Sequence, residues 1–538
     1  MLRMTAPTWG LVGAAFALVA LVVYSPALNG HWIGDDLGYV VNNAYIHELD
    51  ARAVLALFDP SGDAALFTAN YAPIHNLAHA LEWQLFGPAT TGYHVVNVLL
   101  HAGTSLLLAA VFLASGIPRS AALLLAGVFL VHPANVEAVA WIFQLKTILA
   151  LGLSLGALLA FARRPALSLA LLALALLSKI SAAYALPVLG VRLWVRREHD
   201  RGAWAWLAAW TVVLVLCALP EFLAFERLGH AATLARYRDG FEQLRSVVAI
   251  GGRYLVMAAT SWGVAAGHEP APASSLLDPW WLFGLVALGA LAARTLATLR
   301  RRREEAAWWI WAAASFAPIS QVFVFLYPMA DRYLYFILPG LLGGAFLAGR
   351  EALEALAPRL GGRLAPERAG RAAALAGAAL VALLAVRSFE RAPVWRSEAS
   401  AVADAARHYP DGISAVFLRA RDAASIGDRR AAVTALGSLA ARGFDGFVAL
   451  QQDPAFEGLA TAPGYREAIA QMARNWIAVA GRRTRHVQPE LRTLALAWLT
   501  LGERAKALEA YEAALARGGP LDDTIRAELQ ALRAAGDS

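Results

Sequence analysis

Residues 28–37 read Leu-Asn-Gly-His-Trp-Ile-Gly-Asp-Asp-Leu, and they follow directly on an apolar run over residues 9–28. A helix needs about 20 apolar residues to cross a bilayer, so this run predicts a transmembrane helix. The helix would end just before two adjacent carboxylates, Asp35 and Asp36. Because charge is costly near lipid, such a pair is usually kept for a function. The alternative is a cap or turn role, since Gly34-Asp35-Asp36 also suits a helix start.

The composition of the whole chain is that of a membrane protein. Of its 538 residues, 59% are hydrophobic and 16% are charged, whereas soluble proteins carry about a quarter charged residues. We therefore predict an all-α, polytopic transmembrane helical bundle of about eleven spans, with ten or twelve left open. The predicted spans are 9–28, 92–114, 118–131, 145–162, 165–178, 182–195, 203–220, 279–298, 306–326, 333–349 and 372–388. We expect residues 252–266 to form a surface or re-entrant helix.

Basic residues predict which loops are cytoplasmic. They gather in alternate loops, at Arg119, Arg163-Arg164, 192–201, 294–303 and 350–371. Cytoplasmic loops carry an excess of Lys and Arg, which explains the net charge of +7 better than a nucleic-acid partner does. The loop 29–91 has Arg52 as its only Lys or Arg, so we expect it to be external. The N-terminus is then cytoplasmic. A cleavable signal is the alternative for the first helix, but its length favours retention.

We divide the chain into a transmembrane domain, 1–390, and an extracytoplasmic helical domain, 391–538. Two segments of the second domain superimpose: Gly427, Ala432, Leu436 and Leu439 correspond to Gly502, Ala507, Tyr511 and Ala514. A turn glycine followed by residues where two helices touch is typical of a tetratricopeptide repeat. Three repeats are normally needed for stability, so we expect 443–490 to supply further helix pairs. A packed helical domain without a specific function is the alternative.

Polar side chains recur at the predicted outer ends of the spans. His75 and His79 lie four residues apart on one helical face, and with Glu82 they could bind a metal ion. The other interpretation is an interfacial helix that turns its imidazoles toward water. The second span carries a polar face that we expect to bond helix to helix: His94, Asn97 and His101. The run 132–146 is predicted to lie at the water interface with its polar residues: His132, Asn135, Glu137, Gln144 and Lys146.

Basic side chains near the predicted outer surface are candidates for binding an anionic group such as phosphate. They are Lys146, Lys179, Arg253 and Arg332. Arg332 is the strongest candidate because its guanidinium can hold two oxygens at once, and Tyr333 is one of several aromatic residues around it. Each cation could instead extend along lipid to reach water. We find no glycine-rich nucleotide loop, which disfavours a nucleotide-linked substrate.

These residues together resemble the GT-C membrane glycosyltransferases. They most resemble the branch with a C-terminal tetratricopeptide region, which includes the transmembrane O-mannosyltransferases acting on cadherins and many bacterial relatives. The matching segments are 28–36, Asn70-Tyr-Ala-Pro-Ile, Phe86-Gly-Pro, 92–101, 132–141, Ser178-Lys179, Pro318-Ile-Ser-Gln321 and Asp331-Arg-Tyr-Leu-Tyr335. The family usually has Arg where this chain has Ala72, and Pro where it has Ile180. The lost Arg would shift phosphate contacts to Arg332 and Lys179.

The resemblance implies an inverting transfer of a sugar from a polyprenyl-phosphate donor to an extracytoplasmic protein, lipid or glycan. Asp35 or Asp36 would take the proton of the acceptor hydroxyl, and repulsion between them would make one the stronger base. A phosphate leaves without an acid catalyst. The resemblance implies no metal and no cofactor, because single-phosphate donors in this superfamily generally need no metal. The expected contacts to donor and acceptor are His75, His132, Glu137, Lys146, Lys179, Arg332 and Tyr333. We expect membrane lipids and the polyprenyl-phosphate sugar as partners, a protein acceptor or another protein partner on the tail, and no nucleic acid.

Two other functions remain open at this point. A non-catalytic membrane scaffold that presents its tail to partners would tolerate loss of the carboxylates. An oligosaccharide ligase or polymerase would place its key Arg and His in a large late external loop, whereas the long loop here is the first one. The Ala-, Leu- and Arg-rich composition and the tail predict a bacterial cytoplasmic membrane.

Overall fold

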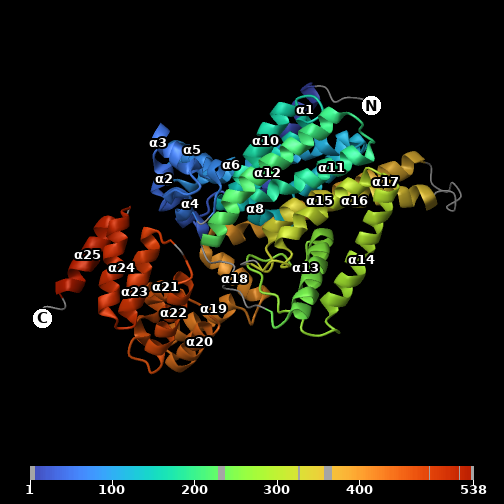
Figure 1. Cartoon of the computed structure of the whole chain (residues 1–538). Helices are drawn as coiled ribbons and strands as arrows, with labels where there is room; N and C mark the ends of the chain where they lie inside the picture. The colour runs from blue at the N-terminus through green and yellow to red at the C-terminus, as the bar shows by residue number, and fades with distance from the viewer. Residues whose placement is uncertain are drawn as a thin grey trace. The chain divides into compact units, whose positions relative to one another are not determined.

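The computed structural model describes residues 6–68, 70–227, 237–324, 327–356, 366–483, 485–519 and 521–534. Every regular element in these ranges is helical, and no β-strand occurs in them (Figure 1). The chain divides into two compact units. One, the membrane unit, comprises 1–36, 72–221 and 236–401, and the other, the tail unit, comprises 37–71, 222–235 and 402–538. The predicted all-α fold is confirmed.

The membrane unit is built from long apolar helices joined by short 3-10 turns. Its α-helices are α1 (Ala6–Tyr24), α5 (Pro73–Phe86), α6 (Thr90–Ala114), α7 (Arg119–Leu130), α8 (Val136–Ala140), α9 (Leu145–Ala160), α10 (Pro165–Ser178), α11 (Ala185–Val195), α12 (Arg201–Arg227), α13 (Gly240–Thr260), α14 (Pro279–Arg300), α15 (Glu305–Phe316), α16 (Asp331–Leu356) and α17 (Pro366–Arg391). The 3-10 turns are η1 (Ser25–Ala27), η3 (Pro133–Asn135), η4 (Ile142–Gln144), η5 (Ile180–Tyr184), η7 (Ala317–Ile319) and η9 (Ala392–Arg396).

Fewer helices reach spanning length than the apolar runs predict. Among the described residues, 7 helices are long and apolar enough to cross a membrane, or 8 if α7 and the stretch Pro133–Ala140 count as one bent span. The predicted spans 165–178, 182–195 and 306–326 are shorter helices, and the last passes into residues outside the described ranges. Pro318 follows α15 at once, and proline stops a helix because it has no N–H. Eleven spans are therefore not confirmed, although the helical bundle is.

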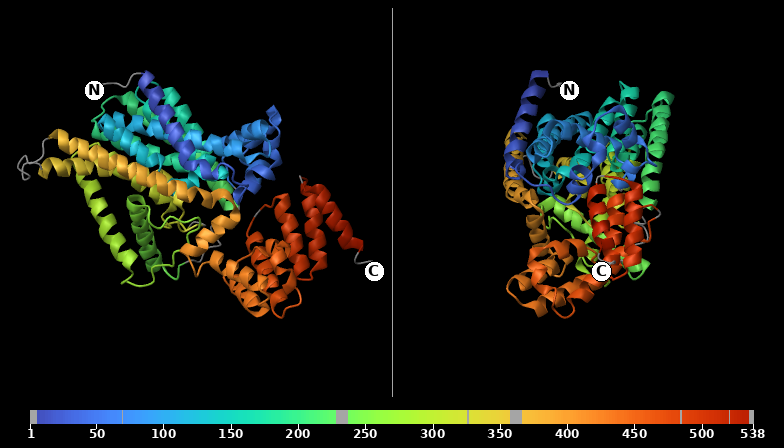
Figure 2. Two further views of the ribbon diagram at one scale, coloured as in Figure 1. Left: turned by 180° about the vertical axis from the view of Figure 1, so that it is seen from behind. Right: turned by 90° about the vertical axis from the view of Figure 1, so that its left-hand side faces the viewer.

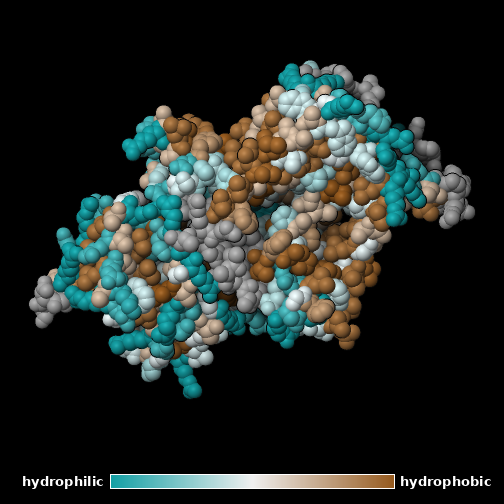
Figure 3. Space-filling model, in the orientation of Figure 1, coloured by the Kyte–Doolittle hydropathy of each residue, from teal (hydrophilic) through white to brown (hydrophobic). Residues whose placement is uncertain are grey.

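Segments from both ends of the membrane unit pack together. α1 contacts α17, and the two helices lie side by side in Figure 2. α13 and α14 pack against each other, and α14 in turn contacts α15 (Figure 1). Figure 3 shows extensive hydrophobic surface on the helices of this unit. Residues such as Val215, Leu219 and Val286 are more than half exposed, as expected for helices that face lipid.

The tail unit combines part of the first loop with the C-terminal helices. Its elements are η2 (Leu37–Val41), α2 (Ala44–His47), α3 (Ala51–Phe58), α4 (Asp63–Phe67), α19 (Ile413–Ser425), α20 (Arg429–Ala441), α21 (Phe447–Gln452), η10 (Pro454–Leu459), α22 (Tyr465–Ala480), α23 (Gln488–Thr500), α24 (Arg504–Arg517) and α25 (Asp522–Ala534), while α18 (Glu398–His408) begins the tail. Its surface is mainly hydrophilic in Figure 3.

The tetratricopeptide-like pattern is confirmed at both predicted places. Gly427 and Gly502 form the turns of the helix pairs α19–α20 and α23–α24, with φ of +80° and +79°. The apolar positions that follow each glycine are all buried: Ala432, Leu436, Leu439, Ala507, Tyr511 and Ala514. The region between the pairs is less regular than expected. It holds the short α21, a 3-10 turn and α22 instead of repeated pairs.

Two glycines of this domain should respond in opposite ways to alanine. Gly427→Ala places a side chain in the left-handed region and should destabilise the tail by about 1 kcal/mol. Gly437→Ala lies within α20 with no neighbour within 4 Å of an added Cβ, and should stabilise it by about 0.5–1 kcal/mol. Hydrogen exchange of the α19 and α20 amides in the full-length detergent-solubilised chain measures both. Equal shifts in the two variants would contradict the turn assignment.

Candidate functional site

The site is organised around a break in the polypeptide after α7. Pro133 cannot donate a backbone hydrogen bond and disfavours a helical conformation at the preceding residue. His132 is accordingly extended, with φ −74° and ψ 128°. α7 and the stretch Pro133–Ala140 meet at 51°. The chain then passes through η3, α8 and η4 before α9 begins, and nearly every residue of this stretch is buried.

Side chains from four segments satisfy the carbonyls that the break leaves free. Phe129 O accepts from Asn135 (2.6 Å), Leu130 O from His101 Nε2 (2.9 Å) and Tyr24 (3.1 Å), and Val131 O from Ser388 (2.8 Å). On α6, Asn97 also donates to Trp141 O at 3.2 Å. Unsatisfied carbonyls cost several kcal/mol in apolar surroundings. The prediction that the polar face of the second span bonds helix to helix is therefore confirmed for Asn97 and His101.

This arrangement gives Asp35 and Asp36 different environments. Asp36 is fully buried, and its two oxygens accept from Phe143 N at 2.8 Å and from Ile33 N at 3.0 Å. Trp141 Nε1 donates to Ile33 O at 3.2 Å, which fixes the same turn a second time. Burial raises the pKa of Asp36 to about 7, against the opposing effect of the two amides. Asp36 therefore anchors the turn, close to the cap role that the sequence left open.

Asp35 is the more accessible member of the pair. It is only partly buried, and it interacts electrostatically with Lys146 and with Tyr327. Gly34 precedes it with φ +51°, a left-handed conformation that glycine adopts without strain. A Cβ on Gly34 would lie 3.5 Å from the Trp141 ring. Asp35 is thus the carboxylate that can meet another molecule.

Arg332 lies on the same side of the unit, paired with Glu137. Its guanidinium forms an ion pair with Glu137, and its backbone N–H donates to Glu137 Oε2 at 2.7 Å. Glu137 thereby binds both the backbone of the first turn of α16 and the side chain of Arg332. The Arg332 guanidinium packs within 5.0 Å of the Tyr327 ring centre, 5.1 Å of Tyr333 and 5.6 Å of Trp141. Its remaining N–H donors can bind oxygens of an anion.

Two lysines complete the basic cluster. Lys179 Nζ donates to Thr147 Oγ1 at 2.8 Å, and Lys146 Nζ lies 3.8 Å from the Phe143 ring centre. Lys146 interacts electrostatically with Arg332, and Lys179 with both of them. Cations from three separate segments therefore converge near Asp35. The prediction placed Lys146 at the water interface, but only 7% of it is exposed, because the break after α7 draws this stretch into the bundle.

His75 lies at the edge of this cluster, buried on α5. Its ring packs at 4.4 Å from His79 and at 5.6 Å from Phe143. His79 Nδ1 contacts Glu82 Oε2 at 2.7 Å. Burial lowers the pKa of His75 well below its usual value, so the ring is neutral. The prediction of an interfacial helix with solvated imidazoles is wrong, because both rings have 0% exposure. In the described ranges, no group of three or more His, Cys, Asp or Glu could hold a metal ion.

Two predicted residues lie away from the cluster. His132 Nδ1 accepts from Ala134 N, so its Nε2 donates to Ala258 O, both at 3.2 Å. It is buried rather than at the water interface, and it holds the break in place. Arg253 stacks on Trp280, with 4.5 Å from its guanidinium carbon to the ring centre, and so does not join Arg332.

Sequence reasoning missed the contacts that run through the backbone. The amide of Phe143 and the hydroxyl of Thr147 position Asp36 and Lys179, yet neither residue type suggests such a role. Tyr327 is one of several aromatic residues near Arg332 in the sequence, and no local pattern singles it out. A buried carboxylate needs N–H donors, so a partner for Asp36 could be expected from the sequence. The sequence does not show that Phe143 is that partner.

Arginine residues cluster at the helix ends that are remote from the site. Lys146 and Arg332 lie at the starts of α9 and α16, and Lys179 follows the end of α10. The opposite ends of these three helices lead to basic residues. There Arg192 and Arg196 bond Glu304, and Arg294 bonds Glu305. An excess of Arg is what the sequence predicts for the cytoplasmic side, and Lys146, Lys179 and Arg332 lie at the other ends of these segments.

Comparison with known proteins gives two curated relatives. Protein O-mannosyl-transferase F38B6.6 of Caenorhabditis elegans is 28% identical over 174 residues, which is 30% of this chain and 24% of the relative. Protein O-mannosyl-transferase TMTC4 of Homo sapiens is 33% identical over 143 residues, which is 23% of this chain and 19% of the relative. The chain resembles a GT-C glycosyltransferase with a tetratricopeptide region. No family model and no solved structure matches the chain.

The comparison corrects the predicted location. Both relatives are animal proteins, and animal cells have no bacterial cytoplasmic membrane. The prediction of a bacterial inner-membrane protein, drawn from composition, is therefore wrong. Amino-acid composition misled the prediction, because a chain rich in Ala, Leu and Arg reflects the base composition of its genome as much as its cellular compartment. The matches cover less than a third of either relative's length.

The raised pKa of Asp36 predicts a specific pH dependence of stability. The folded chain holds this proton more tightly than the unfolded chain, whose aspartate pKa is about 3.9. The contribution of Asp36 to stability is thus greatest below pH about 4 and falls as pH rises to about 7. Asp36→Asn should remove this pH dependence of stability. It should also destabilise the fold by about 1–3 kcal/mol, because asparagine can accept only one of the two backbone N–H hydrogen bonds.

Thermal unfolding of the detergent-solubilised chain at pH 5 and pH 8 measures the effect. Asp35→Asn is the matched control and should keep the slope of the unchanged protein, because Asp36 remains in place. Identical slopes in the unchanged protein and Asp36→Asn would show that Asp36 does not bury its carboxyl group.

Proposed function

We propose that the chain is an inverting glycosyltransferase that uses a polyprenyl-phosphate-linked sugar, with mannose as the first sugar to test. The observation that carries this proposal is the convergence of Asp35 with Lys146, Lys179 and Arg332 at one end of the helices. The names of the two relatives support a mannosyl donor. The acceptor is a hydroxyl group on the non-cytoplasmic side, and the reaction needs neither metal nor cofactor.

An apolar cavity in the same unit supports the lipid-linked donor. It measures about 540 Å³ and lies among α13, α14, α15 and α16, with Leu288, Leu291 and Phe316 in its wall. Tyr254 also lines it, and the Tyr254 hydroxyl accepts from Ala330 N at 3.0 Å and donates to Ala330 O at 3.1 Å. One residue of the cavity wall, Tyr254, therefore contacts the backbone two positions before Arg332. A polyprenyl chain fits an apolar cavity of this size, with its phosphate toward the cations.

The reaction follows from these placements. The carboxylate of Asp35 takes the proton of the acceptor hydroxyl as its oxygen attacks the anomeric carbon of the sugar. The bond between that carbon and the phosphate oxygen breaks, and the phosphate leaves with the electron pair. Lys146, Lys179 and Arg332 stabilise the added negative charge on the phosphate. The configuration inverts because attack and departure occur on opposite faces.

Within the tail unit, the first-loop helices pack on the C-terminal helices. Arg517 forms an ion pair with Asp63, and Arg485 donates to Ser61 O at 3.0 Å. A cavity of about 200 Å³ lies between these segments, with Tyr45 and Phe67 on one side. These contacts support a role of the tail in binding a protein acceptor, because the loop that follows Asp36 is part of the same unit.

Replacement of the accessible carboxylate should abolish transfer. Asp35→Asn should lower the rate about 10²- to 10⁴-fold, which is the usual contribution of a general base. The measurement is transfer of labelled mannose from polyprenyl-phosphate-mannose to proteins of membranes that carry the chain. Asp50→Asn is the control: it lies in the same loop, and asparagine keeps the cap on Ala53 N. Full activity of Asp35→Asn would favour the non-catalytic scaffold.

The cavity should determine how long a lipid the chain accepts. Ala313→Phe places a ring inside it and should raise the KM for a long-chain donor about tenfold, the effect of losing about 1.4 kcal/mol of binding. A donor with two isoprene units should be unaffected. Ala293→Phe, exposed on α14 outside the cavity, is the matched control. Equal KM changes for both donor lengths would place the lipid elsewhere.

A further inference from the structure

A buried carboxylate lies directly beside Arg332 in the chain. Asp331 has 0% exposure. It contacts His268 Nε2 at 2.7 Å, accepts from Ala265 N at 3.2 Å and pairs with Arg391 at 3.5 Å. A buried carboxylate is costly unless donors surround it. The donors here come from two segments outside α16, so Asp331 joins α16 to both.

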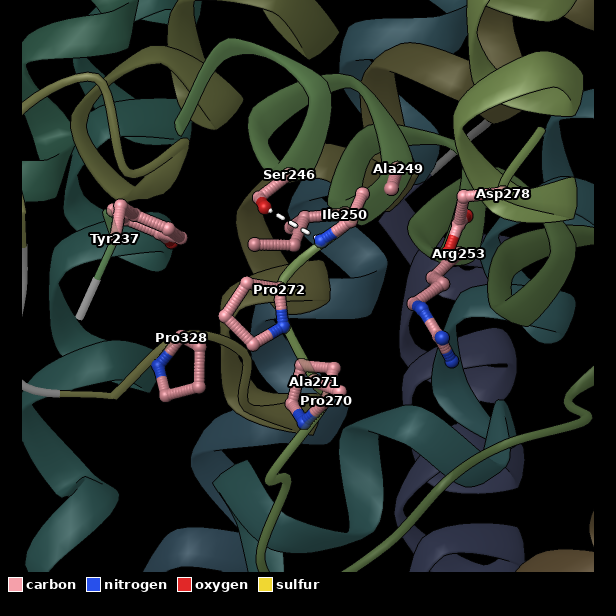
Figure 4. A pocket seen from close by; sticks show the side chains of 11 residues that line it. Tyr237, Ser246, Ala249, Ile250, Arg253, Pro270, Ala271, Pro272, Asp278 and Pro328 are labelled. Atoms are coloured by element: carbon pink, nitrogen blue, oxygen red, sulfur yellow. Dashed lines mark hydrogen bonds between the residues drawn. The ribbon is translucent and has the colours of Figure 1, made fainter. Parts of the chain in front are cut away.

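One of these segments is a short strap, residues 265–273, between α13 and α14. At its far end, Ala273 N donates to Ser246 Oγ at 2.9 Å and Arg245 donates to Ala273 O at 2.8 Å. Figure 4 shows Pro270 and Pro272 in an extended stretch of this strap, next to Ser246. Proline restricts the backbone of such a stretch. The cavity beside the strap is only about 10 Å³, room for about one water.

The strap therefore holds the start of α16 through Asp331, in addition to the contact that Glu137 makes with Arg332. Glu137 holds the backbone N–H of Arg332, and Tyr254 holds both backbone groups of Ala330. Asp331 lies between these residues and is held by His268. The direction of the Arg332 side chain depends on this turn, because a side chain follows its backbone.

We infer that His268, acting through Asp331, is a positioning residue that sets the direction of Arg332 toward the donor phosphate. The inference rests on the proposed function, in which Arg332 binds that phosphate. Neither His268 nor Asp331 touches the donor. Their contribution is orientation, since bidentate recognition of a phosphate requires a guanidinium in one place and plane.

A pair of variants at one position separates orientation from packing. His268→Gln keeps an N–H donor near Asp331, while His268→Leu keeps the bulk and removes the donor. Binding of polyprenyl phosphate, without sugar, to the full-length chain in nanodiscs is the probe. We expect His268→Leu to weaken binding about tenfold and His268→Gln less than about threefold, because only His268→Gln keeps a hydrogen-bond donor for the charged Asp331. Equal losses in both variants would overturn the inference.

A double-mutant cycle tests whether the effect passes through Arg332. Arg332→Lys keeps a cation beside Glu137 and loses the planar fork, so it should weaken binding by itself. In that background His268→Leu should cause no further loss. A full additional loss would overturn the inference and leave the proposed function intact. Unchanged binding in Arg332→Lys would overturn the assigned role of Arg332 in the proposed function, and this inference with it.

A variant at the far end of the strap covers the case in which His268→Leu does not fold. Ser246→Ala removes the acceptor of Ala273 N and leaves the contacts of Asp331 untouched. It should weaken binding of polyprenyl phosphate about threefold in the unchanged background and not at all in Arg332→Lys. Binding equal to that of the unchanged protein would overturn the inference.

Discussion

The structure depends on satisfying backbone carbonyls where a helix breaks inside an apolar bundle. Pro133 stops the helical path, and Leu130 O and its neighbours would otherwise lie unpaired where water is scarce. Polar side chains of α1, α6 and α17 donate to them. Elements from the beginning and the end of the membrane unit therefore meet at this break. A polar interior in such a chain is a requirement of its backbone as much as of its chemistry.

The break also determines how the charged groups divide their work. Because residues 136–144 turn back into the bundle, the amide of Phe143 meets Asp36 and the carboxylate of Glu137 meets Arg332. Asp36 and Glu137 are thus used to hold the structure. Asp35 remains accessible beside cations that come from separate helices. The site is an arrangement of helix ends.

Much of the fold could be predicted from the sequence, but less of the site. Apolar runs located the long helices, and a single glycine in each pair located the turns of the tail. Burial could not be predicted, since His75 and Lys146 look like interfacial residues until the broken segment is seen to enter the bundle. The division of Asp35 from Asp36 depends on a partner 107 positions away, and no local pattern encodes it. The predicted number of spans is not confirmed for a similar reason, because short helices can be apolar throughout.

Gly34 has a consequence beyond this chain. Its left-handed backbone turns the direction of the chain between Ile33 and Asp35, and residues other than glycine and asparagine adopt that conformation only at a cost of about 1–2 kcal/mol. A glycine in front of two aspartates is therefore a more selective search pattern than the aspartates alone. Sequences that carry the acids without it are expected to direct them differently, and to belong to proteins with another use for the pair.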